Sequence, residues 1–470
     1  MSFNSWTFVL FVLPVLGLYY ILPFRWQNRM LLVASCIFYA SWNWRFLFLL
    51  LLQTSIDFFV GQRVHDSESP VTRKRLLLLS IAANLGILGV FKYFNFFVDS
   101  ASFLATALNV HVSLPTLQVI LPVGISFYTF HAMSYTIDIY RKKLVPIQDF
   151  WDYMLFVLYF PQLVAGPIAR ASLLLPQVTH PRTITRNKVA EGLWLILWGY
   201  FKKMVVADNL AVVVDQVFGH AHAVHGASCL FALYCFAFQI YCDFSGYTDI
   251  ARGFGKLMGF ELTLNFNRPY LATNPSDFWQ RWHISLSSWL RDYLYIPLGG
   301  SRNGKWMTYR NLMLTMLLGG LWHGAAWNFV IWGGYHGALL VGYKVWSERV
   351  NLRLTGFAST AAVWASRILM FNLTCLGWLF FRARSYGQIM QFLHKMVFDF
   401  RFDTEAAVIF GALVLFGGAV TVLDAWLKNT DDPRKRPLWN WGLGPATASI
   451  LAAGIVMFAQ SAQKFLYFQF

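Results

Sequence analysis

Residues 76–98 read LLLLSIAANLGILGVFKYFNFFV and contain a single charged side chain, Lys92. At about 1.5 Å of rise per residue, a helix of this length spans the ~30 Å hydrocarbon core of a bilayer. Three basic residues, RKR at 73–75, precede the stretch, whereas residues 99–116 after it hold no lysine or arginine. The stretch therefore predicts a transmembrane helix whose first end lies in the cytoplasm.

The composition of this stretch extends over the whole chain. Of the 470 residues, 57% are hydrophobic and only 13% are charged, whereas a soluble domain carries about 25% charged residues. The other apolar runs are residues 6–24, 30–42, 46–60, 117–140, 189–201, 227–250, 311–335, 361–381, 406–426 and 443–459. We predict an all-α polytopic membrane protein of about 11–14 helices, embedded in the lipid bilayer.

The net charge of +16 is distributed over loops between the apolar runs. This scatter excludes a nucleic-acid-binding protein, in which basic residues gather on one polar domain. Basic loops lie at 25–29, 61–75, 141–143 and 428–437, whereas residues 1–5 and the connection 99–116 hold no lysine or arginine. The positive-inside rule then predicts that the N-terminus and residues 464–470 both lie outside the cytoplasm.

Neither the cysteines nor the acidic residues show the spacing of a metal site, so we predict no metal and no bound cofactor. The cysteines lie in or beside apolar runs and are interpreted as buried thiols; they are Cys36, Cys229, Cys235, Cys242 and Cys375.

Residues 252–310 differ from the rest of the chain. They hold eight lysines or arginines and three acids, are rich in aromatic residues, and contain no apolar run of spanning length. Glycine and proline punctuate them throughout. We predict amphipathic and re-entrant helices that line a funnel on the cytoplasmic side.

His323 lies in the stretch LLGGLWHGAAW at 317–327. If a helix begins near Asn311, this side chain is about 18 Å along it, close to the middle of the bilayer. An ionisable group at that depth indicates a functional site, although a neutral histidine with one structural hydrogen bond fits equally well. Gly319, Gly320 and Gly324 leave room beside the imidazole for close helix packing or for a substrate tunnel. His283, in FWQRWHISLSSWL at 278–290, is more often structural in such a setting.

Eight stretches, two of which contain these histidines, give the chain a resemblance to a known family. They are 122–141 (PVGISFYTFHAMSYTIDIYR), 159–168 (YFPQLVAGPI), 241–253 (YCDFSGYTDIARG), 265–270 (NFNRPY), 277–300 (DFWQRWHISLSSWLRDYLYIPLGG), 319–327 (GGLWHGAAW), 332–337 (WGGYHG) and 378–383 (WLFFRA). In this order they resemble the membrane-bound O-acyltransferases, in particular the bacterial branch typified by the membrane subunit of alginate O-acetyltransferase. Residues before 122 and residues 385–436 match weakly.

The resemblance implies a single domain, 1–470, with N-terminal helices at 1–116, a catalytic core at 117–383 and C-terminal helices at 384–470. It implies a helical bundle around a central tunnel, with His323 as catalytic base and His283 as a second polar residue of the tunnel. A neutral imidazole within about 3 Å of a hydroxyl can remove its proton. Further tunnel residues are expected at Trp282, Trp322, Gly320, Gly324 and His336. Basic residues expected to bind the donor, acetyl-CoA, are Arg281, Arg291, Arg302 and Lys305.

The last six residues, 465–470, read FLYFQF. This tail resembles a C-terminal aromatic motif of bacterial cell-envelope acylation systems, which implies that Tyr467 carries the acyl group as an ester. The alternative is an aromatic anchor for the last helix at the membrane interface.

The function implied is O-acetylation of an extracytoplasmic polysaccharide such as alginate or cellulose, across the bacterial inner membrane. The resemblance also implies a periplasmic partner of the SGNH-hydrolase type or other polysaccharide-acetylation subunits. Acylation of peptidoglycan or teichoic acid remains an alternative. A lipid or polymer transporter would need internal repeats, and a polyprenyl-type transferase an acidic cluster for Mg²⁺; the sequence favours neither.

Overall fold

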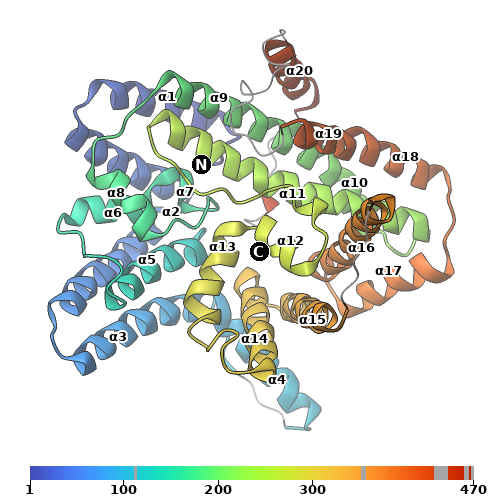
Figure 1. The fold of residues 1–470 in the computed structure, drawn as a ribbon, viewed down its shortest axis with the longest axis horizontal. Coiled ribbons are helices and arrows are strands. Elements are labelled where there is room, and N and C mark those ends of the chain that lie inside the picture. The colour runs from blue at the N-terminus through green and yellow to red at the C-terminus, as the bar shows by residue number, and fades with distance from the viewer. Residues whose placement is uncertain (111–113, 351–355, 428–442, 460–464, 467–470) are drawn as a thin grey trace. The chain divides into compact units, whose positions relative to one another are not determined.

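The computed structural model describes residues 1–110, 114–350, 356–427, 443–459 and 465–466. Every regular element in these ranges is a helix (Figure 1). The chain forms two compact units. Unit 1 comprises Met1–Gly192 and Ala251–Thr263, and unit 2 comprises Leu193–Ile250 and Leu264–Phe470. The predicted single domain and its internal boundaries stay a prediction.

Unit 1 is built mainly from N-terminal helices. Its elements are α1 (Trp6–Ile21), α2 (Phe24–Asp66), α3 (Pro70–Leu88), the π-helical turn η1 (Gly89–Tyr93), α4 (Phe94–Ala107), α5 (Ile125–Tyr140), α6 (Phe150–Leu158), α7 (Phe160–Leu163) and α8 (Ala171–Thr179), with the first part of α9 (Arg186–Tyr200) and the end of α11 (Gly226–Leu257).

Unit 2 takes up the rest of α9 and α11. Its other elements are η2 (Phe201–Ala207), α10 (Asp208–Gly219), η3 (Pro269–Leu271), α12 (Pro275–Arg281), α13 (Ile284–Leu290), η4 (Arg291–Tyr295), α14 (Lys305–His323), α15 (Trp327–Arg349), α16 (Gly356–Arg382), α17 (Tyr386–Phe398), α18 (Thr404–Ala412), η5 (Leu413–Gly417), α19 (Gly418–Leu427) and α20 (Leu443–Phe458).

Five helical stretches in the described ranges are long and apolar enough to cross a membrane. They are Phe24–Asp66, Pro70–Ala107, Gly226–Leu257, Ala358–Arg382 and Thr404–Ala425. The predicted all-α polytopic architecture is thereby confirmed. The two apolar runs predicted at 30–42 and 46–60 belong to one long helix, α2, which is kinked at Asn43, where the backbone leaves the helical region (φ −161°, ψ 109°).

Local sequence signals set several helix starts. Ser69 accepts a hydrogen bond from the amide of Thr72, and Pro70 occupies the first turn of α3. Asn274 caps α12 in the same way, with Pro275 in the first turn. A short polar side chain before a helix satisfies an amide that has no partner within the helix, and proline is tolerated in the first turn because it lacks that amide.

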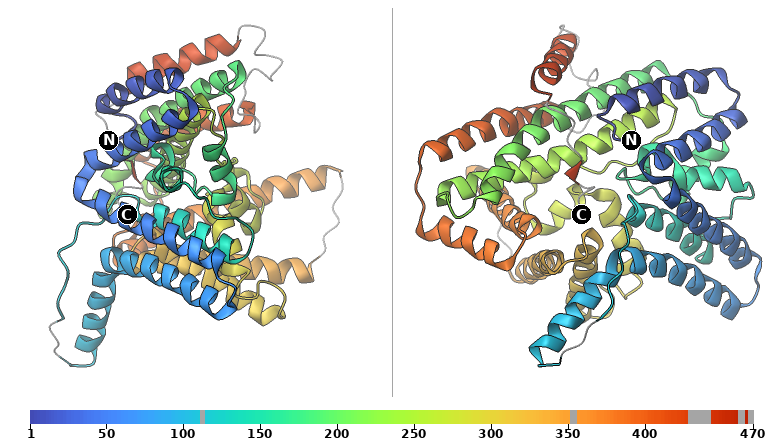
Figure 2. Two further views of the ribbon diagram at one scale, coloured as in Figure 1. Left: turned by 90° about the vertical axis from the view of Figure 1, so that its left-hand side faces the viewer. Right: turned by 180° about the vertical axis from the view of Figure 1, so that it is seen from behind.

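Helix α5 forms the centre of unit 1, where α2 and α3 pack against it (Figures 1 and 2). Residues 125–139 of this helix are all buried. A helix that is buried on every side fits its mixed apolar sequence, which shows no polar face. The carboxylate of Asp57 on α2 is also buried and accepts hydrogen bonds from Ser80 and Asn84 of α3.

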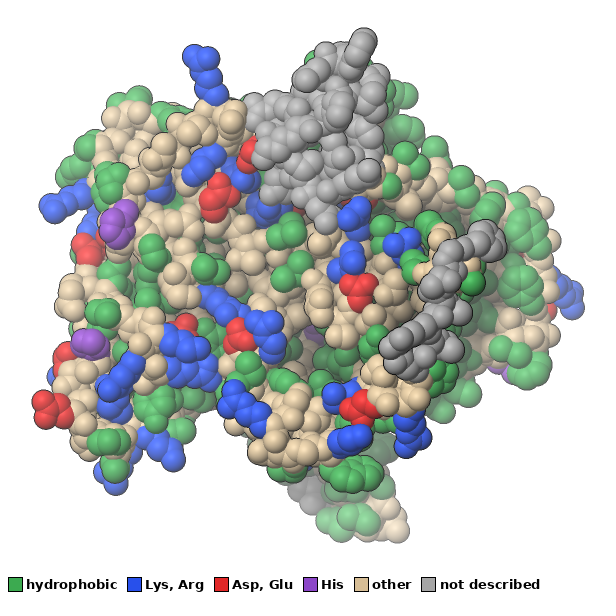
Figure 3. Space-filling view, viewed as in Figure 1, with side chains coloured by type: hydrophobic (Ala, Val, Ile, Leu, Met, Phe, Trp, Pro, Cys, Tyr) green, Lys and Arg blue, Asp and Glu red, His purple; other side chains and the backbone are tan. Residues whose placement is uncertain are grey.

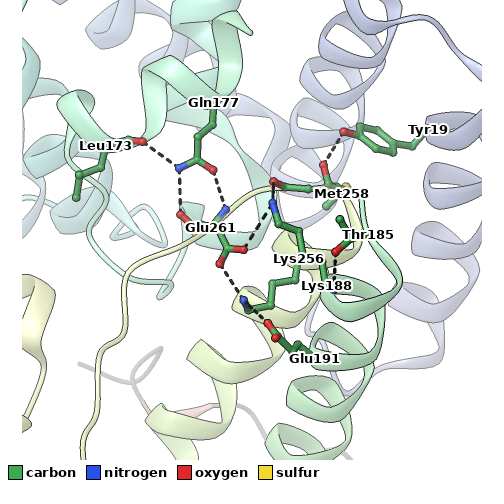
Figure 4. Close-up of polar contacts among 10 residues, drawn as sticks. Tyr19, Leu173, Gln177, Thr185, Lys188, Glu191, Lys256, Met258 and Glu261 are labelled. Carbon is green, nitrogen blue, oxygen red and sulfur yellow. Dashed lines mark hydrogen bonds and ion pairs between the residues drawn. The ribbon is translucent and has the colours of Figure 1, made fainter. Parts of the chain in front are cut away.

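A second polar cluster of unit 1 joins the end of α11 to the start of α9 (Figure 4). The Lys256 ammonium lies 2.9 Å from a carboxylate oxygen of Glu191 and 2.9 Å from one of Glu261. Gln177 on α8 accepts a hydrogen bond from the amide of Glu261 at 2.7 Å. These contacts hold the segment that leads from α11 toward the short helices of unit 2.

Candidate functional site: two histidines beside a cavity

The helix that carries His323 begins earlier than expected and ends at this residue. Helix α14 begins at Lys305, six residues before the expected start, and Gly324 has an extended backbone (φ −159°, ψ 149°) that stops it. Helix α15 starts at Trp327, so the apolar run 311–335 forms two helices. Hydropathy alone reads through such a break, because glycine and alanine are not polar.

Glycines let α14 and α15 pack closely, which is one of the two roles considered for them. A Cβ atom on Gly320 would lie 2.2 Å from the carbonyl oxygen of Phe329, and one on Gly324 would lie 2.1 Å from the ring of Phe329. The facing Gly333 is as tightly placed, 2.3 Å from the carbonyl oxygen of Met316. Small residues at such positions allow two helix backbones to approach. Gly320 and Gly324 therefore shape the helix pair and do not line the cavity described below.

This close packing predicts opposite effects for two substitutions in the pair. Gly320→Ala should lower the stability of the purified protein by about 1–3 kcal/mol, because backbone atoms must move to admit the methyl group. Gly342→Ala on α15 is the matched control, since nothing lies within 4 Å of its added Cβ and alanine is the better helix former. Thermal unfolding in detergent measures both. Equal melting temperatures for the two variants would contradict the packing described.

His283 occupies a strained turn between α12 and α13. Its backbone is left-handed (φ 44°, ψ 53°), a conformation that is uncommon for residues other than glycine. Asn265 holds the turn: its carbonyl accepts from the amide of Ile284 at 3.0 Å, and its side-chain oxygen accepts from the Ser285 hydroxyl at 2.6 Å. Strain of this kind persists where the surroundings fix it and is concentrated at functional sites.

The two histidines lie side by side although 40 positions separate them in the sequence. Their ring centroids are 6.4 Å apart. The His323 ring also contacts Trp332 at 5.1 Å and Phe381 at 5.6 Å, and the His283 ring contacts Phe244 at 4.7 Å. His283, outside the five apolar spans, is fully buried, and burial lowers the pKa of its imidazole to about 3. It is therefore neutral at physiological pH.

A cavity of about 500 Å³ in unit 2 opens beside this pair. His323 lines it and His283 does not. Its lining residues come from α12 to α15: Ser276, Trp279, Gln280, Ile284, Leu286, Ser287, Ser288, Leu290, Arg291, Tyr295, Leu312, Thr315, Met316, Gly319, His323, Trp332 and Leu340. This volume is typical of small-molecule sites, which combine apolar walls with a few polar groups.

The geometry gives the site an imidazole at the wall of a largely apolar cavity. Such a group can accept a proton from a hydroxyl and return it to a leaving group. Within the described residues, no three histidine, cysteine, aspartate or glutamate side chains are grouped so that they could hold a metal ion. The chemistry that the cavity supports is proton transfer coupled to attack by a hydroxyl oxygen.

Comparison with known proteins identifies the family. The profile of MBOAT, the membrane-bound O-acyltransferase family, matches residues 140–380, which include both histidines. This chain belongs to the membrane-bound O-acyltransferases. It is 43% identical to the "Probable alginate O-acetylase AlgI" of Azotobacter vinelandii over 82% of this chain and 76% of the relative. It is 39% identical to the protein of that name from Pseudomonas putida over the full length of both. It is 36% identical to the "Peptidoglycan O-acetyltransferase" of Helicobacter pylori, over 84% of this chain and 79% of the relative.

Membership of the family confirms the predicted resemblance and makes this chain a multi-pass membrane acyltransferase. The short helices α12 and α13 fall where the sequence predicts a region without full spans. The roles predicted for individual residues stay predictions. The structure shows where these residues lie.

The remaining residues predicted to form the acyltransferase tunnel lie behind the cavity wall. Trp282 packs on Trp378, with ring centroids 4.8 Å apart. His336 is buried against Trp332 at 4.9 Å, and Trp322 lies next to His323 with ring centroids 5.0 Å apart. None of these three predicted residues lines the cavity. His336 and Trp322 each contact an aromatic ring that lines the cavity, namely Trp332 and His323.

The four basic residues predicted to bind the donor do not act as a group. Arg291 lines the cavity and pairs with Asp292 at 2.7 Å. Arg281 pairs with Asp277 of its own helix, and Lys305 pairs with Glu348 of α15 at 2.8 Å. Arg302 is exposed and does not line the cavity. Among the four, the structure therefore favours Arg291 as a ligand for an anionic donor.

Sequence reasoning missed several polar residues of this site. Thr315 and Tyr295 line the cavity, but a single threonine or tyrosine in an apolar run carries no distinctive signal. It also missed the buried ion pairs of Lys202 and Lys203 with aspartates. Here a signal was available, because Lys202 and Lys203 directly follow the apolar run 189–201, and ionisable side chains next to apolar spans can mark a functional region. Tyr467 lies outside the described residues.

Proposed function

We propose that this acyltransferase moves acetyl groups from cytoplasmic acetyl-CoA across the bacterial inner membrane for O-acetylation of an exported polysaccharide. The observation that carries the proposal is His323 at the wall of a cavity of about 500 Å³, with His283 directly behind it. The relatives named as alginate O-acetylases support the acetyl group and the class of acceptor.

In the proposed reaction, His323 takes the proton of an acceptor hydroxyl. The hydroxyl oxygen attacks the thioester carbonyl of acetyl-CoA, the carbon–sulfur bond breaks, and the thiolate leaves with the proton that His323 returns. The buried His283 orients the ring of His323. Because His283 is neutral, it adds no positive charge beside His323 when His323 takes up the proton. Apolar walls exclude water, which would otherwise hydrolyse the thioester.

The acceptor hydroxyl is proposed to be that of Tyr467, from which the acetyl group passes to a periplasmic partner of the SGNH-hydrolase type. A polymer chain is too large for a cavity of about 500 Å³, so a carrier and a separate polymer-modifying enzyme fit its size. With the N-terminus and the C-terminus both periplasmic, Tyr467 starts on the side where the polymer lies. The basic loops support this orientation. Figure 3 shows lysine and arginine side chains together with acidic ones on the face in view.

Deletion of the gene, followed by complementation, tests the proposed acceptor. We expect ester-linked acetate to be lost from the extracellular polysaccharide and to return on complementation with the wild-type chain but not with His323→Ala. Because one relative is named a peptidoglycan O-acetyltransferase, purified peptidoglycan from the same cells is measured in parallel. Loss of acetate from peptidoglycan alone would replace the proposed acceptor with that alternative.

Binding of the donor predicts a difference between two arginines. Arg291→Glu should raise the KM for acetyl-CoA by about three- to tenfold, because a carboxylate at the cavity repels the donor's phosphates. Arg302→Glu makes the same charge change at an exposed position away from the cavity and should change KM by less than about twofold. Initial rates with the chain in liposomes measure both, and equal KM values would exclude Arg291 as a donor ligand.

A further inference from the structure

A buried ionic cluster lies on η2, α10 and α11 of unit 2, outside the cavity. The Lys203 ammonium is 2.7 Å from a carboxylate oxygen of Asp208 and 2.7 Å from one of Asp243. All three side chains are buried. One ammonium thus faces two carboxylates, and buried carboxylates need further donors to offset their loss of water. Nothing in the proposed acyl transfer uses these groups.

The C-terminal segment supplies such a donor. The backbone N–H of Leu466 donates to the second carboxylate oxygen of Asp243 at 2.8 Å. The Phe465 ring lies over the Lys203 ammonium, 4.4 Å from its centroid, and meets the Tyr247 ring edge-on at 5.0 Å. Phe465 and Leu466 are both buried. A hydrogen bond to a carboxylate and a cation over an aromatic face are both strengthened where water is excluded.

We propose that Asp243, held in place by Lys203, is a docking site that binds the C-terminal segment of this chain at Leu466. Asp243 accepts from a backbone amide and so fixes the position of the segment along its length. Asp208 forms a second ion pair with the Lys203 ammonium and so holds Lys203 between the two carboxylates. This docking does not depend on whether the tail carries an acetyl group.

The position of the docking site gives it a role in the proposed function, on which this step rests. Residue 467, the proposed carrier, follows Leu466 directly. Phe244 follows Asp243 on α11, and its ring contacts the His283 ring at 4.7 Å. Asp243, which binds the tail, and Phe244, which contacts His283, are therefore adjacent residues of one helix. In the proposed function, Asp243 is therefore a positioning residue for the carrier that follows Leu466 in the sequence.

Trypsin tests the docking directly, because Lys464 immediately precedes Phe465. Cleavage after Lys464 releases the peptide 465–470, and a protease needs the residues on both sides of the bond in an extended, undocked form. With the full chain in detergent micelles, we expect the wild type to resist release of this peptide, as followed by mass spectrometry. Asp243→Ala and Leu466→Pro should release it at least about tenfold faster, since each removes one partner of the hydrogen bond.

Matched variants separate docking from general damage. Leu466→Ala keeps the backbone N–H that Leu466→Pro removes, and Asp208→Asn changes the other carboxylate on Lys203 but leaves Asp243 in place. Both should stay resistant to trypsin. Because Leu466→Pro leaves Asp243 and Lys203 unchanged, it keeps the test valid even if Asp243→Ala fails to fold. Equal release from Leu466→Pro and Leu466→Ala would overturn the docking site.

Acetylation measured on the same variants distinguishes this inference from the proposed function. Leu466→Pro should lower polysaccharide acetylation at least about tenfold relative to Leu466→Ala, because the carrier is no longer positioned. Tyr467→Phe should remain resistant to trypsin, because it leaves Asp243, Lys203 and the backbone N–H of Leu466 unchanged. If Tyr467→Phe retains acetylation, the carrier role fails while the docking result stands. If Leu466→Pro releases the peptide but acetylates as Leu466→Ala does, Asp243 docks the tail without positioning a carrier, which overturns its positioning role.

Discussion

Replacing His323 by alanine is expected to lower acetyl transfer from acetyl-CoA by about 10²–10⁴-fold, the usual contribution of a general base. His323 lines the cavity, and its ring is held by Trp332 and Phe381. The variant loses the group that accepts the hydroxyl proton, while the cavity keeps its other walls. Initial rates with the purified chain in liposomes measure the loss.

Two controls separate catalysis from folding in this experiment. His323→Gln is closer to histidine in volume and should be as inactive as His323→Ala, with a melting temperature near that of the wild type. His283→Gln should lose less, about tenfold, because His283 acts through its neighbour and does not line the cavity. A folded His323→Gln variant with near wild-type rates would remove His323 from the mechanism.

Tyr467→Phe is expected to abolish acetylation of the polymer while leaving the chain folded and inserted. A phenol has a pKa near 10 and reacts only when a base takes its proton. The aryl ester that forms is a good donor for the next transfer, because phenoxide is a stable leaving group. Phenylalanine keeps the aromatic ring and removes only the hydroxyl. Ester-linked acetate on the extracellular polysaccharide measures the outcome.

The anchor interpretation of the same tail predicts the opposite result. An aromatic residue that only holds the last helix at the interface works equally well as phenylalanine. The contacts of Phe465 with Lys203 and Tyr247 hold the tail in either case. Full acetylation by Tyr467→Phe would therefore leave an anchor and end the carrier role.

Composition and motif order predicted the helical membrane fold and the short helices around His283. The motif match also placed His283 and His323 in one site, although no periodicity in the sequence brings residues 40 positions apart together. This proximity depends on the turn at His283, which Asn265 holds from another segment. A contact of that kind is tertiary and leaves no local pattern.

The helix break after His323 could not be predicted from hydropathy, because Gly324 is as compatible with an apolar helix as with its end. In the structure the backbone of Gly324 is extended, and the ring of Phe329 occupies the space where a Cβ atom of residue 324 would lie. The fold was equally necessary to distinguish among the basic residues predicted to bind the donor. Four basic residues look alike in the sequence, and only the fold shows that Arg291 lines the cavity while Arg281 pairs within its own helix.

In the proposed mechanism, His323 drives acetyl transfer from acetyl-CoA onto the chain's own tail. Incubation of the purified wild-type chain with acetyl-CoA, followed by mass spectrometry of its C-terminal peptide, tests this claim most directly. We predict one ester-linked acetyl group on Tyr467 in the wild type and none in His323→Gln. An unmodified tail in a wild-type chain that still consumes acetyl-CoA, or equal acetylation of the tail in His323→Gln, would contradict the mechanism.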